Sequence, residues 1–249
     1  MKKQVATLVI LSIVLTVALE LPFYHYSVIP NSASAESADI NKVFHWLLII
    51  GLPIFSIVIS GLAVALIFFR SKGQGHEPEY RPTSLPKLEA IWTIVPLLVV
   101  IGVSVFGAVM LEKIVKAEPN ELEIKVTASR YFYQFEYTDT GIKSYELVVP
   151  VGQRIHFSLT STDVVHNFWV REWGPKEDCL PGMITDLRIT PDKIGTFTVQ
   201  CSQLCGPGHT YMTAPVRVLS LDDYNAWVLQ QTQASTTPPP VSTMPGMGP

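Results

Sequence analysis

Two cysteines, a histidine and a methionine lie within twelve residues in the segment Cys201–Met212, which reads CSQLCGPGHTYM. Thiolate and imidazole ligands select copper or zinc. The added thioether favours copper, because a structural zinc site holds four firm Cys or His ligands. Cys201 and Cys205 are four residues apart, a spacing more typical of metal ligands than of a disulfide framework. The segment therefore predicts a copper site.

The second cysteine distinguishes this pattern from a mononuclear copper site, which uses one Cys, two His and a weak axial Met. It is either a spare or a bridge to a second metal, and bridging would delocalise one electron over two coppers. The Gly-Pro-Gly at residues 206–208 combines permissive and fixed dihedrals that let Cys205 and His209 converge. The missing imidazole is expected upstream, at His166 after an apolar run. Alone, that residue would more often be an ordinary histidine.

The elements that position these ligands are expected to be strands. From Glu121 onward, apolar and polar residues alternate in short runs separated by turn signals such as Pro191-Asp192. Several short strands in residues 116–222 predict an antiparallel sandwich or barrel. The tail from Thr232 to Pro249 is rich in Thr, Pro, Gly and Met, so we expect residues 223–249 to be mostly disordered.

The first part of the chain is expected to lie in a membrane. Hydrophobic residues make up 48% of the 249 residues and charged residues 16%, which is too apolar for a fully soluble protein. Residues 46–69 and 90–111 are each long enough to cross a bilayer of about 30 Å, so residues 36–115 predict a transmembrane hairpin.

An earlier apolar block, Val5–Leu19, follows two lysines and precedes Ala33-Ser34-Ala35. It is short for a span, and it lies far from that small-residue motif for a usual cleavage region. Residues 1–35 are therefore either a cleaved signal peptide or a third helix, and both alternatives place residue 36 outside the cell.

The positive charges around the predicted spans give an orientation. The loop at 70–89 holds four basic residues, Arg70, Lys72, Arg81 and Lys87, whereas residues 20–44 hold only Lys42. The positive-inside rule places this loop in the cytoplasm and everything after Leu111 on the outer face. Glu89 then lies at the cytoplasmic mouth of the second span. It is either a solvated interfacial group or, packed against a neighbouring subunit, a proton acceptor.

Three segments together resemble subunit 2 of the cytochrome c oxidases: Cys201–Met212, Asp163-Val164-Val165-His166 and Glu89–Pro96, which reads EAIWTIVP. The resemblance covers the chain from about residue 45 to residue 222. It implies a transmembrane helical hairpin with an all-β, cupredoxin-like Greek-key barrel that carries the dinuclear copper A centre. It also implies the plasma membrane of a bacterium, with the copper domain on the outer face.

The resemblance implies six copper ligands: Cys201 and Cys205 bridging both metals, His166 and Met212 on one copper, and His209 with the backbone carbonyl of Gln203 on the other. Glu89 matches the acidic entrance of the family's proton pathway. Asp178 lies in a segment similar to the family's loop near the subunit interface. Cys179 has no counterpart and is interpreted as a small buried residue.

Two positions depart from the family's pattern. Gln203 stands where the family commonly has a Glu whose side chain also holds magnesium. A neutral amide is a weaker ligand for a hard cation, which puts the magnesium site in question. Tyr131, in Arg130–Tyr137, stands where electrons usually enter through a Trp.

The function implied by the resemblance is electron entry into a respiratory oxidase. Cytochrome c or a similar carrier reduces the copper pair near Tyr131. The electron continues to haem in catalytic subunit 1, where oxygen is reduced to water and protons are pumped. Other expected partners are further oxidase subunits and membrane lipid. A net charge of −3 without a Lys/Arg-rich run gives no support for nucleic acid.

After residue 116, nine basic and fourteen acidic side chains leave a charge of −5, which favours a cationic carrier or simply solubilises the surface. One alternative is a copper-free quinol oxidase subunit of the same fold, and the complete ligand set argues against it. Another is a nitrous oxide reductase type of copper module, whose usual context lacks the Glu89–Pro96 signature.

Overall fold

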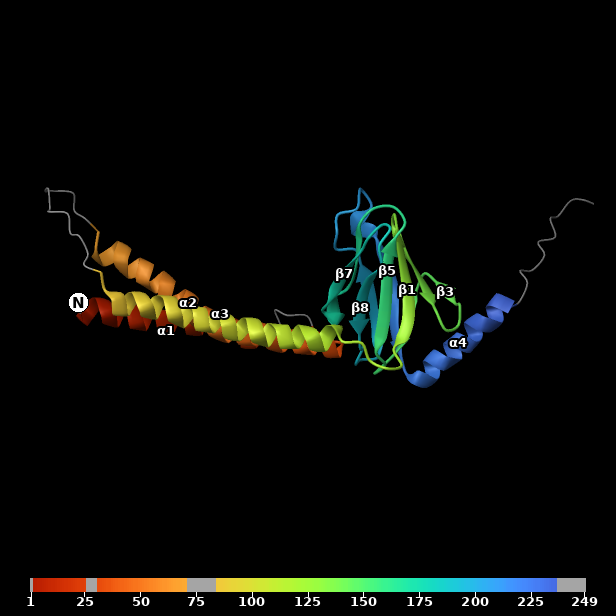
Figure 1. Ribbon diagram of the computed structural model, residues 1–249, viewed down its shortest axis with the longest axis horizontal. Helices are drawn as coiled ribbons and strands as arrows, with labels where there is room; N and C mark the ends of the chain where they lie inside the picture. Colours follow the sequence, from red (N-terminus) through yellow and green to blue (C-terminus); the bar gives the residue numbers. More distant parts are fainter. Residues whose placement is uncertain (1, 26–30, 71–83, 237–249) are drawn as a thin grey trace, which may run out of the picture. The chain divides into compact units, whose positions relative to one another are not determined.

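The computed structural model describes residues 2–25, 31–70 and 84–236 (Figure 1). They form two compact units. The helical unit contains the chain up to residue 31 and residues 39–114, and the β unit contains residues 32–38 and the chain from residue 115. Each unit is described separately below.

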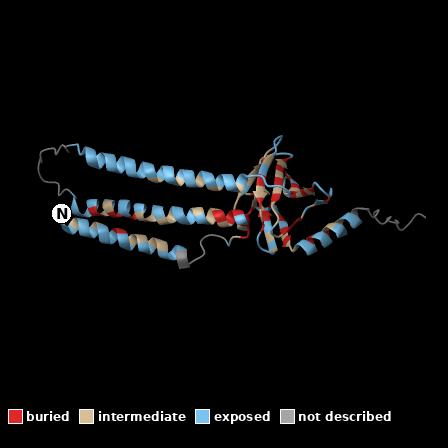
Figure 2. Ribbon diagram, turned by 60° about the horizontal axis from the view of Figure 1, so that its bottom comes forward, coloured by how far each residue is buried: buried red, intermediate tan, exposed pale blue. Residues whose placement is uncertain are grey.

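The helical unit contains α1 (Lys2–His25), α2 (Ala35–Phe68) and α3 (Pro86–Val115). By length and composition, each of these three helices in the described part of the chain is able to cross a membrane. The predicted span 90–111 lies within α3, and the predicted span 46–69 lies in α2 except for its last residue; α2 begins earlier than expected, at Ala35. No described side chain of α3 is buried, and most of the helical surface is exposed apolar surface (Figure 2). Such a surface suits lipid rather than water. The loop residues 71–83, with Lys72 and Arg81, lie outside the described residues.

The first helix packs along the second. A shallow apolar pocket is lined by Ser12, Ile13, Thr16 and Val17 of α1 together with Pro53 and Ile57 of α2. The small side chains Ser56 and Ser60, one turn apart on α2, are fully buried. Small residues at a helix–helix contact let two backbones approach closely in a membrane. Both alternatives for residues 1–35, a cleaved signal peptide and a third membrane helix, remain predictions.

The β unit is a sandwich of two five-stranded sheets. The first sheet has the strand order β3 (Lys143–Ser144), β2 (Phe132–Tyr137), β1 (Leu122–Ser129), β5 (Ile155–Ser161) and β8 (Thr185–Ile189). The second has the order β4 (Leu147–Pro150), β10 (Thr213–Leu219), β9 (Gly195–Gln200), β6 (His166–Val170) and β7 (Lys176–Cys179). Alternate residues of β5, namely Ile155, Phe157 and Leu159, are fully buried between the sheets, as the alternation predicted.

The sheets are mixed, so the expectation of an antiparallel arrangement was wrong in part. Strand β1 runs parallel to β5, and β10 runs parallel to β4, while the other pairs are antiparallel. The chain leaves the first sheet after β3, forms β4 in the second sheet and then returns to β5 beside β1. Alternation specifies which face of a strand is buried, but it does not encode the direction of the partner strand.

Residues 32–38, which we call the docked segment, are built into the β unit. The backbone N–H of Ala33 donates to the carbonyl of Glu172 at 2.8 Å, and that of Ala35 donates to Thr190 at 3.1 Å. The hydroxyl of Ser34 donates to the carbonyl of Trp173 at 2.8 Å and accepts the N–H of Ser37 at 3.0 Å. Ser34 therefore joins the segment to the β unit and also caps the start of α2.

A buried carboxylate completes this contact. Glu36 is only 3% exposed. It accepts Nη1 of Arg154 at 2.9 Å, the backbone N–H of Thr190 at 2.8 Å and the Thr190 hydroxyl at 3.0 Å. Glu121 accepts Nε of Arg154 at 3.1 Å and Nε of Arg188 at 3.1 Å. Burial raises the pKa of Glu121, but the N–H of Glu118 and the two guanidinium groups outweigh it, so the pKa is lowered.

The C-terminal expectation needs a correction. A helix, α4 (Leu221–Thr236), occupies part of the segment expected to be disordered, and residues 237–249 lie outside the described residues. Tyr224 and Trp227 are nearly buried, and the Trp227 ring lies 5.2 Å from the ring of Tyr137 in β2. The Ser220 hydroxyl accepts the N–H of Asp223 and donates to its carboxylate, which is a helix-capping arrangement.

Candidate metal centre

Three neighbouring strands of the second sheet, β10, β9 and β6, bring the predicted ligands together at one of their ends. His166 is the first residue of β6, and Cys201 directly follows β9, which is antiparallel to β6. The short helix η2 (His209–Tyr211) carries His209, and Met212 immediately precedes β10. The N–H of Cys201 donates to the carbonyl of Met212 at 3.1 Å and closes the base of the loop.

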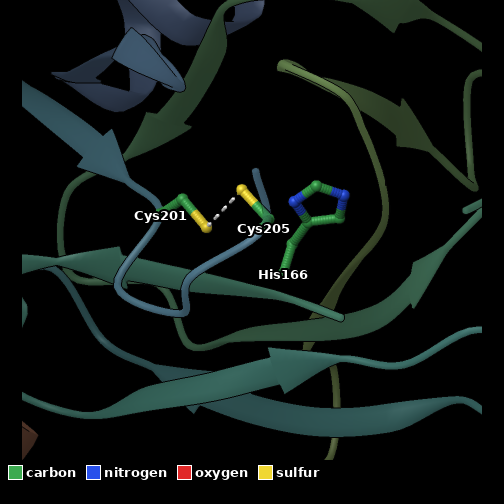
Figure 3. Close-up of side chains that lie close together, drawn as sticks. All are labelled: His166, Cys201 and Cys205. Atoms are coloured by element: carbon green, nitrogen blue, oxygen red, sulfur yellow. Dashed lines mark hydrogen bonds between the residues drawn. The ribbon is translucent and has the colours of Figure 1, made fainter. Parts of the chain in front are cut away.

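The ligand atoms of His166, Cys201 and Cys205 all lie within 4.8 Å of one another (Figure 3). The two sulfur atoms are 3.8 Å apart and are not bonded to each other, since all three cysteines of the chain are free. A disulfide would need a sulfur–sulfur distance of about 2.05 Å. The two thiols therefore face the same small volume as separate donors.

The remaining predicted ligands surround this pair. Nδ1 of His209 lies 3.6 Å from the Cys205 sulfur, and the sulfur of Met212 lies 4.0 Å from it. The Cys201 thiol points to the carbonyl oxygen of Gln203 at 3.2 Å. The structure thus brings all six predicted donor groups together, and their role as metal ligands remains a prediction.

His166 is held in one orientation by a carboxylate. Its Nε2 lies 2.8 Å from Oδ1 of Asp163, and its ring is fully buried. Burial raises the pKa of Asp163. The hydrogen bond to His166 and the N–H groups of Val164 and Arg130 lower it further than burial raises it, so the carboxylate stays ionised. In a neutral imidazole whose Nε2–H donates to Asp163, Nδ1 carries the lone pair that a metal would need.

Nδ1 of His166 is the atom of this ring that would be available to a ligand. It is buried and has no hydrogen-bond partner among the described residues. A buried polar atom without a partner costs free energy unless a water or an ion completes it. Since the ring turns toward Cys201 and Cys205 (Figure 3), an ion held by the thiolates would also satisfy Nδ1.

Both thiols would lose their protons only beside a cation. Burial, followed by the adjacent Cys201 thiol, raises the pKa of Cys205 to about 11. Two buried thiolates side by side would repel each other, so a positively charged metal is needed to deprotonate both. Sulfur and imidazole donors together with a thioether suit copper. The residues present therefore fit the copper site that the sequence predicts.

A second network, which sequence reasoning missed, supports the loop. The Ser202 hydroxyl donates to Oδ1 of Asn167 at 2.6 Å, and Nδ2 of Asn167 donates to Asp178 at 2.8 Å. The backbone carbonyl of Asn167 accepts the hydroxyl of Tyr133 at 2.6 Å. The only sequence signal was position, because Asn167 follows His166 and Ser202 follows Cys201. Asp178 is connected to the loop through two hydrogen bonds.

Two further predicted site residues and Cys179 lie as follows. Tyr131 lies between β1 and β2, half-buried against the glycines of the Cys201–Met212 loop.

Glu89 lies in the first turn of α3, where its Oε1 accepts the Ser84 hydroxyl at 3.1 Å and the Leu85 N–H at 3.2 Å. It therefore caps that helix, and its role in a proton pathway remains a prediction. Cys179 is fully buried, as expected, and burial raises its pKa to about 12.

A second cluster with metal-like spacing, Glu121, Glu123 and His156, does not form a convincing site. Glu121 is already paired with two guanidinium groups. The ring nitrogens of His156 contact Glu123 at 2.7 Å on one side and Asp186 at 2.7 Å on the other. The two guanidinium groups oppose a bound cation, so we assign none here.

Comparison with known proteins matches both parts of the chain. Residues 142–219 match the family model "Cytochrome C oxidase subunit II, periplasmic domain" and residues 22–109 match "Cytochrome C oxidase subunit II, transmembrane domain". The chain belongs to the cytochrome c oxidase subunit II family. Members of this family are membrane-bound subunits of respiratory oxidases, and the apolar helices and β-sandwich found here agree with that assignment.

Relatives within and near the family differ in their electron donor. Cytochrome c oxidase subunit 2 of Thermostichus vulcanus is 27% identical, over 89% of this chain and 83% of that protein. The same subunit of Bacillus sp. (strain PS3) is 32% identical, over 72% of this chain and 53% of that protein. Quinol oxidase subunit 2 of Bacillus cereus is also 32% identical, over 77% of this chain and 69% of that protein.

Among solved structures, the chain is similar to the periplasmic domain of subunit II of cytochrome oxidase from Bradyrhizobium japonicum. The sequence identity is 28%, the match covers 48% of this chain and 98% of that chain, and the TM-score is 0.45.

Proposed function

We propose that this chain is the electron-entry subunit of a respiratory cytochrome c oxidase and that its β unit holds a dinuclear copper A centre. The observation that carries the proposal is the convergence of two unbonded thiols on Nδ1 of buried His166, an atom with no hydrogen-bond partner in the described part of the chain. Such a donor set is left incomplete without a metal, as argued above.

In this proposal the thiolates of Cys201 and Cys205 would hold both copper ions. His166 and Met212 would be the further ligands of one ion, and His209 with the carbonyl of Gln203 those of the other. When bound, the copper pair accepts and releases one electron at a time. The chain contributes rigidity, because Asp163 fixes the ring of His166 and the Cys201–Met212 hydrogen bond closes the loop. A site whose ligands do not move has little rearrangement to make when the charge changes.

The electron donor is proposed to be cytochrome c or a similar cationic carrier that docks near Tyr131. The charge of −5 after residue 116 supports this choice. Two large apolar side chains of the loop, Leu204 and Tyr211, are strongly exposed, and exposed apolar side chains can mark a docking surface. The electron is then relayed to haem in catalytic subunit 1, where oxygen is reduced and protons are pumped.

The remaining parts of the proposal concern the membrane. The helical unit is proposed to lie in lipid in the plasma membrane of a bacterium, with the β unit on the outer face, because the basic residues gather in the loop between the two spans. Glu89 is proposed to receive protons at the cytoplasmic side. A magnesium site beside Gln203 is not part of the proposal, because its amide is a poor ligand for a hard cation.

A second candidate function is that of a quinol oxidase subunit, which the Bacillus cereus relative favours. The two functions differ in whether the β unit carries copper. The presence of all six donor groups in one site supports the first candidate. A purified complex that oxidises a quinol, contains no copper in the β unit and ignores cytochrome c would support the second.

The test replaces single sulfur atoms. Cys201→Ser and Cys205→Ser should each lose copper and abolish carrier oxidation. Cys179→Ser makes the same atomic exchange at a buried cysteine outside the donor set and should keep both properties. Copper is measured per chain together with the absorption spectrum of the purified complex. Full copper and full turnover in either of the first two variants would reject the proposed ligands.

A further inference from the structure

Two glycines of the Cys201–Met212 loop lie against the ring of Tyr131. A Cβ atom added to Gly208 would stand 2.4 Å from Cδ2 of Tyr131 and 2.6 Å from both Cε2 and Cγ. A Cβ added to Gly206 would stand 2.6 Å from the Tyr131 hydroxyl oxygen. All these distances are far inside van der Waals contact, which for carbon atoms begins at about 3.5 Å. The ring therefore lies directly on the loop backbone, with its root over Gly208 and its hydroxyl over Gly206.

The backbone conformation accounts for the glycine at position 206 but not for the glycine at position 208. Gly206 has φ +130°, a conformation that residues with a side chain rarely adopt. Gly208 has φ −89° and ψ 7°, which other residues adopt. At position 208 the requirement for glycine comes from the ring, because Cγ and Cδ2 lie near the root of the Tyr131 side chain. Those atoms cannot move aside without rotating the whole side chain.

The position of Tyr131 is also tied to the ligand His166. The carboxylate of Asp163 that accepts from His166 also accepts the backbone N–H of Arg130 at 2.9 Å. Arg130 directly precedes Tyr131. One carboxylate thus fixes the ligand imidazole and the chain that carries the ring.

We propose that Gly206 and Gly208 form a cradle that positions the Tyr131 ring in direct contact with the backbone between Cys205 and His209. The two glycines act as positioning residues that keep the path from donor to metal short. The proposal rests on the proposed function of electron entry. One electron would leave the reduced carrier, pass across the neutral Tyr131 ring and the loop backbone, and reduce the copper pair by one electron. The ring itself is not oxidised, and no proton moves.

The cradle makes a prediction that does not depend on copper. Gly208→Ala should lower the thermal midpoint of the full-length chain, on the order of 3–8 °C, because the added methyl group overpacks the ring. In a chain that already carries Tyr131→Ala, the same change should cost close to nothing. Gly195→Ala is the matched control, since its added Cβ would meet Phe197 only at an ordinary 3.6 Å. Near-ultraviolet circular dichroism of the chain in detergent follows the transition.

Carrier oxidation by the purified oxidase tests the functional half. Gly208→Ala and Tyr131→Ala should each slow it roughly tenfold while the copper content stays complete. The double variant should have the thermal midpoint of Tyr131→Ala alone and should not recover the rate. If Gly208→Ala loses copper and the double variant regains it, the steric contact is again supported.

Equal thermal effects of Gly208→Ala with and without the ring would overturn the cradle. Wild-type carrier oxidation by Tyr131→Ala with complete copper would overturn the electron route through the ring. If the wild-type chain binds no copper pair, the proposed function fails, whereas the thermal comparison still decides whether the cradle exists.

Discussion

Replacing Asp163 should weaken copper binding far more than it weakens the fold. Its carboxylate accepts Nε2 of His166 at 2.8 Å, the N–H of Val164 at 2.7 Å and the N–H of Arg130 at 2.9 Å. The side chain is 29% exposed, so water can replace it at the backbone N–H groups. The cost to the fold in Asp163→Ala is therefore small, about 1 kcal/mol.

The effect on the metal is larger because the imidazole loses its orientation and its fixed tautomer. Removing such an outer-shell carboxylate typically lowers metal affinity by about 10–100-fold, which corresponds to roughly 1.4–2.7 kcal/mol. Asp163→Asn should fall between the wild type and Asp163→Ala. Its oxygen can still accept Nε2–H of His166, but its amide protons would face the N–H groups of Val164 or Arg130.

The assay is a titration of the copper-loaded complex with a competing chelator, followed by the absorption of the copper centre. The matched control is Asp186→Ala, which removes a carboxylate 2.7 Å from Nε2 of His156, a histidine of the first sheet outside the donor set. That variant should keep the wild-type affinity. An Asp163→Ala complex that holds copper as tightly as the wild type, with an unchanged spectrum, would refute the reasoning.

Four further outcomes follow from the β unit. Glu36→Ala should lower the free energy of unfolding by about 2–4 kcal/mol in denaturant titrations, whereas exposed Glu118→Ala should change it by about 0.5 kcal/mol or less. The folded pKa of Glu121 is lowered from 4.5, so its stabilisation is complete above that pH and is lost as the pH falls through the folded pKa. Glu121→Gln should therefore show a shallower acid limb of unfolding, and an equally steep limb would contradict this. Trp227→Ala should cost about 3 kcal/mol and reduce helical circular dichroism, because α4 loses its contact with the sheet. N-terminal sequencing of the purified subunit should find Ala33 retained whether or not α1 is removed, and a first residue at Glu36 would contradict it.

The donor set was predictable because most of it is local. Five of the six predicted ligands lie within Cys201–Met212, so residue type and spacing alone specify the chemistry. His166 could be added because it stands at the boundary of an apolar run. The arrangement of strands beyond that was not accessible, since neither parallel pair is encoded by alternation.

The sequence did not reveal the contacts between residues that are far apart along the chain. Ala33-Ser34-Ala35 resembled a processing motif because small residues suit a peptidase as well as a close backbone contact. In the structure Ser34 and Glu36 instead contact Trp173, Arg154 and Thr190, more than a hundred positions away. The helix α4 did have a local signal, the Ser220–Asp223 cap, which the composition of the tail obscured.

The docked segment makes the β unit a domain assembled from two separate pieces of chain. The polypeptide passes between the two units three times, near residues 31, 38 and 114. A soluble fragment that begins at residue 116 therefore lacks the docked segment and leaves the N–H of Thr190 without the carboxylate of Glu36. A recombinant β unit that keeps this contact needs the peptide 32–38 fused or added in trans. For the same reason, a protease nick near residue 116 would sever the chain without setting the β unit free.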